Sequence, residues 1–227
     1  VSVRDPGKAE HLRQRGVEVR QGDFDRPESL PQVFAGADRM LLISTSGDNE
    51  TRIRQHLAAV EAAKAAGVGF IAYTSIANAD HSTLSLGEVH RTTEKAIRET
   101  GIPFCFLRNN WYLENELGTI QAVAGGAPLM TAAGSGRVGW APRRDYAVAA
   151  AAVLKGDGHE NAIYELSGKP ITYDELAAAL GEVLGREVSV QHVDDATYES
   201  TMRSIGLPDP VVALLVDIQR GIREGAL

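Results

Sequence analysis

Apolar and polar residues alternate in blocks along the chain, and the blocks predict strands and helices in turn. Short β-branched or wholly apolar runs bounded by glycine or polar residues are typical of strands. Such runs occur at 1–3, 16–23, 39–45, 68–75, 102–110, 161–168 and 187–193. The run at 39–45 has the continuous apolar character expected of a strand buried on both faces of a parallel sheet.

Helical segments fill the gaps between these strands. Helical spacing predicts them at 27–37, 50–66, 85–101, 143–155 and 172–185. Gly67 and Gly185 stand where helices commonly end. A further helix is expected from about Trp111, and the tail from 194 to 227 is predicted to be mainly helical and broken at Pro208 and Pro210. The alternation predicts an α/β protein with a Rossmann-type, doubly wound parallel sheet in one compact unit.

Composition narrows the class of protein. With 227 residues and 44% hydrophobic content, the chain can bury one sizeable core. A net charge of −7 without a dense Lys/Arg cluster argues against nucleic acid or an anionic membrane as partner. No apolar run is long enough to span a bilayer, no secretory leader is seen, and Cys105 is the single cysteine, so we expect a cytoplasmic protein. The histidines are scattered without metal-ligand spacing, so no metal site is predicted.

Polar side chains recur at the carboxyl ends of the predicted strands, where open parallel sheets bind their ligands. Polar residues end most strands, so each one alone has an ordinary explanation. Their recurrence on successive strands favours a nucleotide-binding crevice. The candidates are Arg4, Asp23, Phe24, Ser44, Thr45, Ser46, Thr74, Ser75, Arg108, Asn109 and Asn110, followed by Trp111 and Tyr112.

Arg4 bears on the choice of dinucleotide. An NAD enzyme usually carries Asp or Glu at the end of its second strand, to hold the ribose 2′-hydroxyl. An arginine suits NADP instead, because its planar guanidinium pairs with the 2′-phosphate. A solvated loop arginine explains the residue equally well, and both interpretations stay open.

Familiar catalytic motifs are absent or misplaced. The stretch GSGRVG matches GxGxxG at Gly134, Gly136 and Gly139, but aromatic and proline residues follow where a helix should begin, so a loop is predicted. No tyrosine has a lysine four residues later, and no GxSxG motif occurs. His90 lies in a predicted helix with Glu94 one turn later on the same face, where a chemical role competes with ordinary packing.

Several stretches together form a family pattern, namely VRDPGKAEHL, GVEVRQGDFDRPESL, LLIST, AAKAAGVGFIAYTS, HRTTEKAI and GIPFCFLRNNWYLEN. They resemble the NmrA-like branch of atypical short-chain dehydrogenases, above all its NADPH-dependent quinone oxidoreductases, with triphenylmethane reductase a near relative. The resemblance extends over essentially the whole chain. It implies a glycine-rich first βα unit before Val1 and a further helical segment after Leu227, so the chain resembles an internal fragment whose sheet lacks its first βα unit.

The resemblance also implies roles for the candidate residues. Arg4 would meet the 2′-phosphate of NADPH, Asp23 and Phe24 the adenine region, and the Ser44–Ser46 tip the ribose. The segment that would line the nicotinamide and substrate end comprises Asn110, Trp111, Tyr112, Leu113, Glu114 and Asn115. The cofactor-binding set is completed by Thr74, Ser75 and Asn109, and the catalytic candidates are His90, Asn110 and Tyr112. His90 occupies the place of an active-site lysine in other members.

This similarity implies an NADPH-dependent oxidoreductase that passes a hydride to a quinone or a similar planar acceptor. A reduced quinone is a stabilised phenolate-type product that water can protonate, so a Tyr/Lys pair is dispensable. Trp111 and Tyr112 would form an aromatic wall for the acceptor, while Asn110 and His90 polarise its oxygen. Packing under a loop is the competing explanation for these side chains.

Two alternatives remain. The chain could be a non-catalytic, NADP-binding redox-sensing regulator of NmrA type, or a fragment that binds NADPH weakly or not at all because a strand between 1–3 and 39–45 would be missing. We expect a single NAD(P)-binding domain over 1–227, with a core at about 1–108 and 136–168 and a small α/β substrate lobe at about 109–135 and 169–227. A homodimer is left open.

Overall fold

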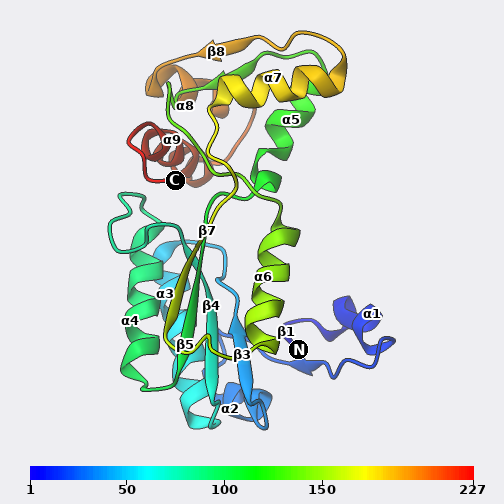
Figure 1. Cartoon of the computed structure of the whole chain (residues 1–227), viewed down its shortest axis with the longest axis vertical. Coiled ribbons are helices and arrows are strands. Elements are labelled where there is room, and N and C mark those ends of the chain that lie inside the picture. The colour runs from blue at the N-terminus through cyan, green and yellow to red at the C-terminus, as the bar shows by residue number, and fades with distance from the viewer. The chain divides into compact units, whose positions relative to one another are not determined.

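The computed structural model describes all 227 residues, and strands alternate with helices along the chain (Figure 1). The strands are β1 (Ser2–Val3), β2 (Arg20–Gln21), β3 (Arg39–Leu42), β4 (Phe70–Ile76), β5 (Phe104–Asn109), β6 (Leu129–Thr131), β7 (Ala162–Leu166) and β8 (Val190–His192). The helices are α1 (Glu10–Arg13), α2 (Leu30–Phe34), α3 (Asn49–Ala65), α4 (Gly87–Glu99), α5 (Leu117–Ala124), α6 (Arg143–Lys155), α7 (Tyr173–Leu184), α8 (Asp195–Ser204) and α9 (Asp209–Arg223). Short 3-10 turns precede α1, α2 and α5, at η1 (Pro6–Ala9), η2 (Pro27–Ser29) and η3 (Leu113–Glu116). The predicted α/β class is confirmed.

The chain divides into two compact units. Unit 1 comprises Val1–Ser75, Glu88–Leu107 and Ala150–Tyr164. Unit 2 comprises Ile76–Gly87, Arg108–Ala149 and Glu165–Leu227. The core and substrate lobe expected from the sequence have other boundaries, and that assignment stays a prediction.

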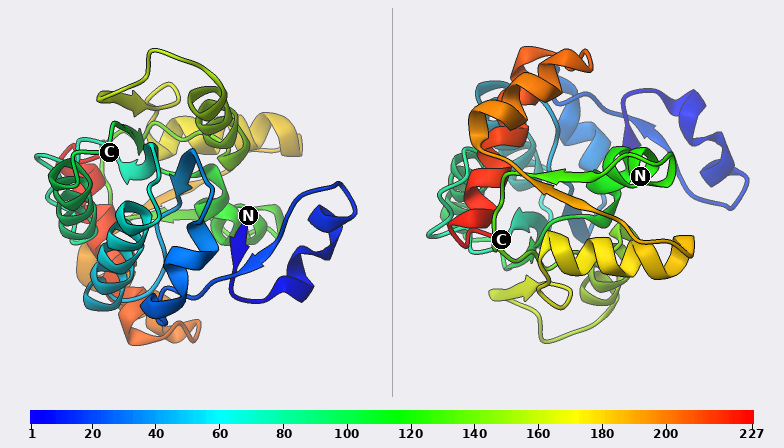
Figure 2. Two further views of the ribbon diagram at one scale, coloured as in Figure 1. Left: turned by 90° about the horizontal axis from the view of Figure 1, so that it is seen from below. Right: turned by 90° about the horizontal axis from the view of Figure 1, so that it is seen from above.

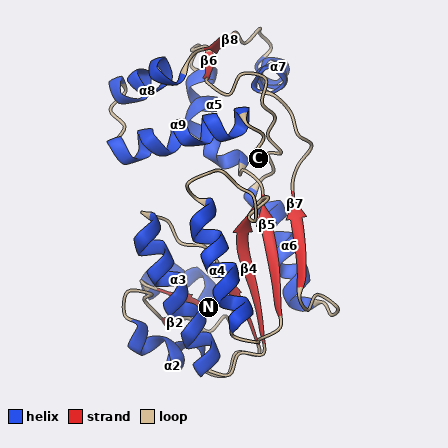
Figure 3. Cartoon of the chain, turned by 90° about the vertical axis from the view of Figure 1, so that its left-hand side faces the viewer, coloured by secondary structure: helices blue, strands red, loops and turns tan.

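Unit 1 is built on a sheet of strand order β3-β4-β5-β7. β3 and β4 run parallel, with Arg39 opposite Phe70 and Leu42 opposite Tyr73. The central strands β4 and β5 are almost wholly buried, since α3 and α4 cover one face of the sheet and α6 covers the other (Figure 3). Helices on both faces give the doubly wound arrangement that the sequence predicts.

β3 is shorter and more exposed than its apolar sequence predicts. The expected strand at 39–45 ends at Leu42, which is buried, and the next side chain, Ile43, is 63% exposed. β3 lies at the edge of its sheet, with β4 as its single neighbour. The prediction of burial on both faces is therefore wrong for β3 and correct for β4 and β5.

β1 and β2 form a separate parallel pair, with Ser2 opposite Arg20. α1 buries none of its side chains. Together with its flanking loops, α1 projects away from the four-stranded sheet of unit 1 (Figures 1 and 2).

Unit 2 contains the parallel pair β6–β8 and the helices α5, α7, α8 and α9. α7 ends at Gly185 in the left-handed conformation, as predicted, and α3 in unit 1 is likewise followed by Gly67 at φ +74°. The tail is broken between α8 and α9, as predicted: Pro208 precedes α9, and Pro210 lies in its first turn, where its missing N–H removes no helical bond. The helix expected from Trp111 begins later, as η3 and then α5.

The GSGRVG stretch is a loop between β6 and α6, as predicted. Its glycines permit close packing inside unit 2. A Cβ on Gly136 would lie 2.4 Å from the carbonyl oxygen of Ile222, and one on Gly139 would lie 1.8 Å from Ser167 Oγ. No helix of the chain combines the length and the apolar character needed to cross a bilayer.

Candidate functional site

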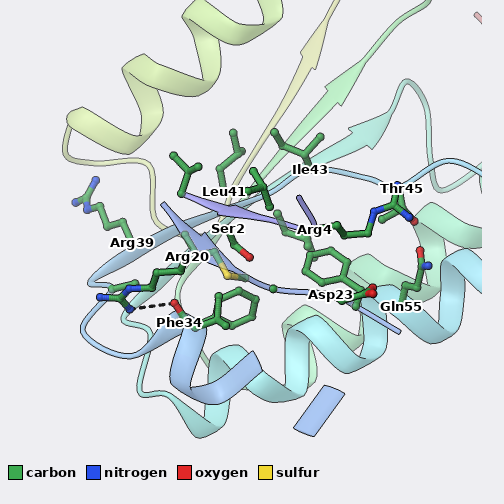
Figure 4. A pocket seen from close by; sticks show the side chains of 18 of the residues that line it. Ser2, Arg4, Arg20, Asp23, Phe34, Arg39, Leu41, Ile43, Thr45 and Gln55 are labelled. Atoms are coloured by element: carbon green, nitrogen blue, oxygen red, sulfur yellow. Dashed lines mark hydrogen bonds between the residues drawn. The ribbon is translucent and has the colours of Figure 1, made fainter. Parts of the chain in front are cut away.

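A cavity of about 880 Å³ in unit 1 brings together residues from three successive strand ends (Figure 4). It lies beside β1, β2 and the edge strand β3, and residues of α2 and α3 complete its wall. The predicted residues that line it are Arg4, Asp23, Phe24, Ser44, Thr45 and Ser46. β1 and β2 belong to a different sheet from β3, and the cavity runs along the unpaired edge of β3 that faces them.

Arg4 lies at one end of this cavity with Asp23, Thr45 and Gln55 (Figure 4). It follows β1 directly and is exposed. Its carbonyl accepts from Gln21 Nε2 at 3.2 Å, but its guanidinium makes no hydrogen bond and no ion pair. The Asp25 carboxylate is near enough to feel its charge but forms no ion pair with it, so this guanidinium can receive an anionic ligand.

The other arginines of the cavity are committed to protein groups. Arg20 binds the Glu18 carboxylate at 2.8 Å and the carbonyl oxygens of Val33 and Ala35. Arg39 donates to three carbonyl oxygens at the C-terminal end of α6. Arg4 is thus the cavity's available cation.

The β3 tip is held by side chains of its neighbours. The Ser44 N–H donates to Thr74 Oγ1 at 2.9 Å, and Arg52 donates to Ser44 Oγ at 2.9 Å. The Thr45 N–H donates to His56 Nε2 at 2.9 Å. These bonds fix the backbone of the tip, whereas Ser46 is exposed at its end.

The helix α3 contributes a residue that the sequence analysis missed. Gln55 lines the cavity, donates from Nε2 to Asp25 Oδ2 at 3.1 Å, and keeps a buried Oε1 without a partner. Arg54 also binds Asp25, at 2.6 Å, and this bond, followed by the Gln55 bond, lowers the pKa of the Asp25 carboxyl. Ala59 and Val60 follow one turn later on the same buried helix face, and this spacing was the available signal.

A buried acceptor without a donor costs about 1–3 kcal/mol. Gln55 Oε1 at the cavity wall therefore fits a ligand that carries N–H or O–H groups, such as a nucleotide.

His90 is buried in unit 1, 6% exposed, against β4. Its Nδ1 lies 2.9 Å from the Tyr73 hydroxyl. Burial, with the nearby charge of Arg52 and the neighbouring His56, lowers the pKa of His90 to about 3, so the ring is neutral at pH 7. The predicted partner Glu94 is buried as well, and accepts from Ser75 Oγ at 2.6 Å.

Among the predicted residues of unit 2, Asn109 and Tyr112 form a polar cluster. Asn109 Nδ2 donates to the Tyr112 hydroxyl at 3.1 Å, while the buried Asn109 Oδ1 has no partner. The Tyr112 ring lies 5.1 Å from the ring of Tyr146, whose buried hydroxyl is also without a partner. Tyr146 is a second residue that the sequence analysis missed, and no pattern in the sequence distinguishes it from core.

The rest of this segment makes structural contacts. Asn110 accepts from the Trp111 N–H at 2.6 Å through Oδ1, and Trp111 and Leu113 pack against the core of unit 2. Glu114 accepts from the Arg143 N–H at the start of α6, which lowers the pKa of its carboxyl. Asn115 is exposed.

The family model described as the NmrA-like family matches residues 1–224. The chain belongs to the NmrA-like family. Arg4, the strand tips around the cavity and the Asn109–Asn115 segment all lie within the matched range.

Several of the similar proteins are named as reductases or oxidoreductases. Quinone oxidoreductase 2 of Escherichia coli is 41% identical over 226 residues, which cover 99% of this chain and 79% of that protein. The NAD(P)H azoreductase of Xenophilus azovorans is 30% identical over 209 residues, or 91% of this chain and 72% of the relative. The crystal structure of Citrobacter sp. triphenylmethane reductase complexed with NADP(H) matches with a TM-score of 0.94 and 42% identity, over 99% of this chain and 80% of that chain.

Proposed function

We propose that this NmrA-like protein is an NADPH-dependent oxidoreductase that reduces a quinone or a similar planar acceptor. The observation that carries the proposal is the Arg4 guanidinium, which lines the cavity and forms no hydrogen bond or ion pair with the protein. Relatives named as a quinone oxidoreductase, an azoreductase and a triphenylmethane reductase support the choice of acceptor, because their acceptors are planar conjugated molecules.

The residues of the cavity fit NADPH. Arg4 would hold the 2′-phosphate, Asp23 and Phe24 the adenine region, and the Ser44–Ser46 tip the ribose. The Thr74 and Ser75 hydroxyls bind the Ser44 N–H and Glu94, and we assign them to shaping the strand ends that receive the cofactor. When bound, NADPH supplies a hydride from nicotinamide C4.

The segment Asn109–Asn115 would serve the nicotinamide and acceptor end. Tyr112 presents an aromatic ring beside Tyr146, and the unpaired Asn109 Oδ1 supports a ligand with N–H or O–H groups in contact with this cluster. A quinone gains one hydride from the cofactor and one proton from water, which yields a hydroquinone and NADP⁺. His90 and Asn110 would polarise the acceptor oxygen.

The test is steady-state NADPH oxidation with a benzoquinone by the wild-type chain and the variant Arg4→Ala. We expect the KM for NADPH to rise about thirtyfold in R4A, because a charge-assisted bidentate contact to phosphate is lost, and the KM for NADH to stay unchanged. Arg15→Ala, which removes another exposed arginine outside the cavity, is the matched control. Equal KM values for NADPH in R4A and wild type would refute the assignment of Arg4, and nucleotide binding without turnover would favour the redox-sensing regulator.

A further inference from the structure

A buried set of hydrogen bonds connects the β3 tip to His90 inside unit 1. The Thr45 N–H donates to His56 Nε2 at 2.9 Å, and His56 Nδ1 lies 2.9 Å from Thr93 Oγ1. The Tyr73 hydroxyl lies 2.9 Å from His90 Nδ1 and 3.5 Å from His56 Nδ1. His56 and Tyr73 are fully buried.

The backbone N–H of Thr45 can only donate, and this fixes which atoms donate and which accept in the other hydrogen bonds of the set. Because Nε2 of His56 accepts from a backbone N–H, the proton of the neutral ring is on Nδ1 and is donated to Thr93 Oγ1. Thr93 in turn donates its own hydroxyl proton to the Val89 carbonyl at 2.7 Å. Since His56 Nδ1 already carries a proton, it cannot accept from Tyr73.

Ser44 and Thr93 also lie within hydrogen-bonding range of the Tyr73 hydroxyl. Of the two ring nitrogens beside this hydroxyl, only His90 Nδ1, at 2.9 Å, is free to accept its proton. A ring nitrogen that accepts is unprotonated, so the proton of neutral His90 is on Nε2. Nε2 forms no hydrogen bond with the protein, so its N–H is the donor of the ring that is left for a ligand.

The surroundings also keep both rings uncharged. Arg52 on α3 faces His56 and His90, and its positive charge adds to the effect of burial. The acidic side chain near Tyr73 is Glu94 on α4, which is already engaged by Ser75 and lies 3.6 Å from Arg98. The pKa of His56 falls to about 4 and that of His90 to about 3, while burial raises the pKa of Tyr73, so no group of the set titrates near pH 7.

We propose that Tyr73 is a positioning residue that holds His90 as the Nε2–H tautomer, so that a neutral imidazole N–H, not an imidazolium, donates a hydrogen bond to the acceptor oxygen. The catalytic consequence rests on the proposed reductase function. A neutral donor suits a quinone, whose reduced oxygen can take its proton from water. Thr45 and Thr93 fix the proton of His56 on Nδ1. That nitrogen therefore cannot compete with His90 Nδ1 for the Tyr73 proton.

The tautomer is measured directly by ¹⁵N NMR of the histidine side chains. In the wild-type chain we expect His90 to show a protonated Nε2 and an unprotonated Nδ1, unchanged between pH 8 and pH 5.5. Tyr73→Phe keeps the ring and removes the hydroxyl, and it should convert His90 to a mixture of tautomers. Tyr164→Phe is the matched control, because Tyr164 and His159 form the same kind of bond, at 2.9 Å, elsewhere in unit 1.

Kinetics test the positioning role. Tyr73→Phe should lower kcat with a benzoquinone about tenfold and leave the KM for NADPH unchanged, whereas Tyr164→Phe should change neither. His90→Gln retains an N–H donor without a tautomer, so Tyr73→Phe should cost nothing further in that background.

The outcomes separate the two proposals. Absence of quinone turnover in the wild-type chain refutes the reductase function, but the NMR result still decides the tautomer. An Nδ1–H tautomer in the wild type, or an unchanged Nε2–H tautomer in Tyr73→Phe, overturns the role of Tyr73. If Tyr73→Phe does not fold, the wild-type NMR spectrum still decides the tautomer. The pH dependence of the wild-type kcat is a second test: a kcat that rises as a group with a pKa near 6.5 becomes protonated would show an imidazolium donor and overturn the proposal.

Discussion

Glu116 is a buried carboxyl in unit 2 that the proposed chemistry does not use. It accepts from the Tyr173 hydroxyl at 3.1 Å and from Trp140 Nε1 at 3.3 Å, and Gln219 donates to the same tyrosine at 2.9 Å. Burial raises its pKa, against the opposing effect of these hydrogen bonds. The group therefore stabilises the fold as an acceptor and destabilises it as a charge.

A neutral hydrogen-bond acceptor should replace the Glu116 carboxylate without loss of stability. Because the folded pKa lies above the unfolded one, the stability contributed by protonated Glu116 is present at low pH and is lost as pH rises through the folded pKa. We expect Glu116→Gln to be at least as stable as the wild type at pH 7. Glu116→Leu should lose about 1–3 kcal/mol, because Trp140 Nε1 and the Tyr173 hydroxyl are left without an acceptor.

Urea unfolding at pH 7 and pH 4.5 measures both effects. The advantage of Glu116→Gln over the wild type should shrink at the lower pH. Equal destabilisation by the Gln and Leu substitutions would show that size, and not hydrogen bonding, dominates at this position.

The C-terminal end of α6 is capped by an arginine from the neighbouring strand β3. Arg39 in β3 donates through one guanidinium nitrogen to the carbonyl oxygens of Val153, Leu154 and Gly156, at 3.3, 3.2 and 2.5 Å. The last carbonyls of a helix have no intrahelical donor and carry the negative end of its dipole, so a guanidinium there is stabilising.

We expect Arg39→Met to lower the free energy of unfolding by about 2 kcal/mol, because the aliphatic stem is kept and the cap is lost. Backbone amides at the end of α6 and in β3 should exchange faster with deuterium. Arg144→Met removes an exposed arginine near the start of the same helix and should change stability by less than about 0.5 kcal/mol. An equal effect of both substitutions would contradict the capping role.

Element positions were largely predictable, and their ends were not. The glycines at 67 and 185 ended helices as predicted, because a left-handed residue is encoded locally. β3 was predicted too long and too buried from its apolar run alone, although the family resemblance implied that a strand between it and 1–3 would be missing. The break in the helical tail falls at Pro208 and Pro210 as predicted, because proline suits the start of a helix and not its interior.

At the scale of the whole molecule, the two units should respond to acid in opposite ways. His56 and His90 in unit 1 have folded pKa values of about 4 and 3, below the value near 6.5 of an unfolded histidine. Their contribution to stability is fully present above pH 6.5 and is lost as pH falls toward the folded pKa values, at roughly 1.4 kcal/mol per pH unit for each ring. Glu116 in unit 2 acts with the opposite sign.

Native-state hydrogen exchange, corrected for intrinsic rates, distinguishes the units. Between pH 7 and pH 5, amides of β4 should lose protection, whereas amides of α7 should keep it. His56→Leu is a poor probe because it removes the Thr45 contact, so the pH series is made on the wild-type chain. Uniform loss of protection in both units would contradict the expectation.

The sequence by itself determined the α/β class, the helix ends marked by glycine, the loop nature of GSGRVG and the residues that follow each strand. These features depend on local backbone preference and on the alternation of apolar runs, which the order of residues carries directly. The family pattern, likewise, is carried by stretches of adjacent residues.

Only the tertiary structure decided which of these residues meet and what they are free to do. It showed that the Arg4 guanidinium forms no hydrogen bond or ion pair, that Gln55 has an unpaired oxygen, and that Thr74 and Ser75 are already bound to protein groups. It also joined His56, Tyr73 and His90 into one directional set. Hydrogen-bond partners and desolvation arise between residues far apart in the chain, so they exist only once packing has brought those residues together.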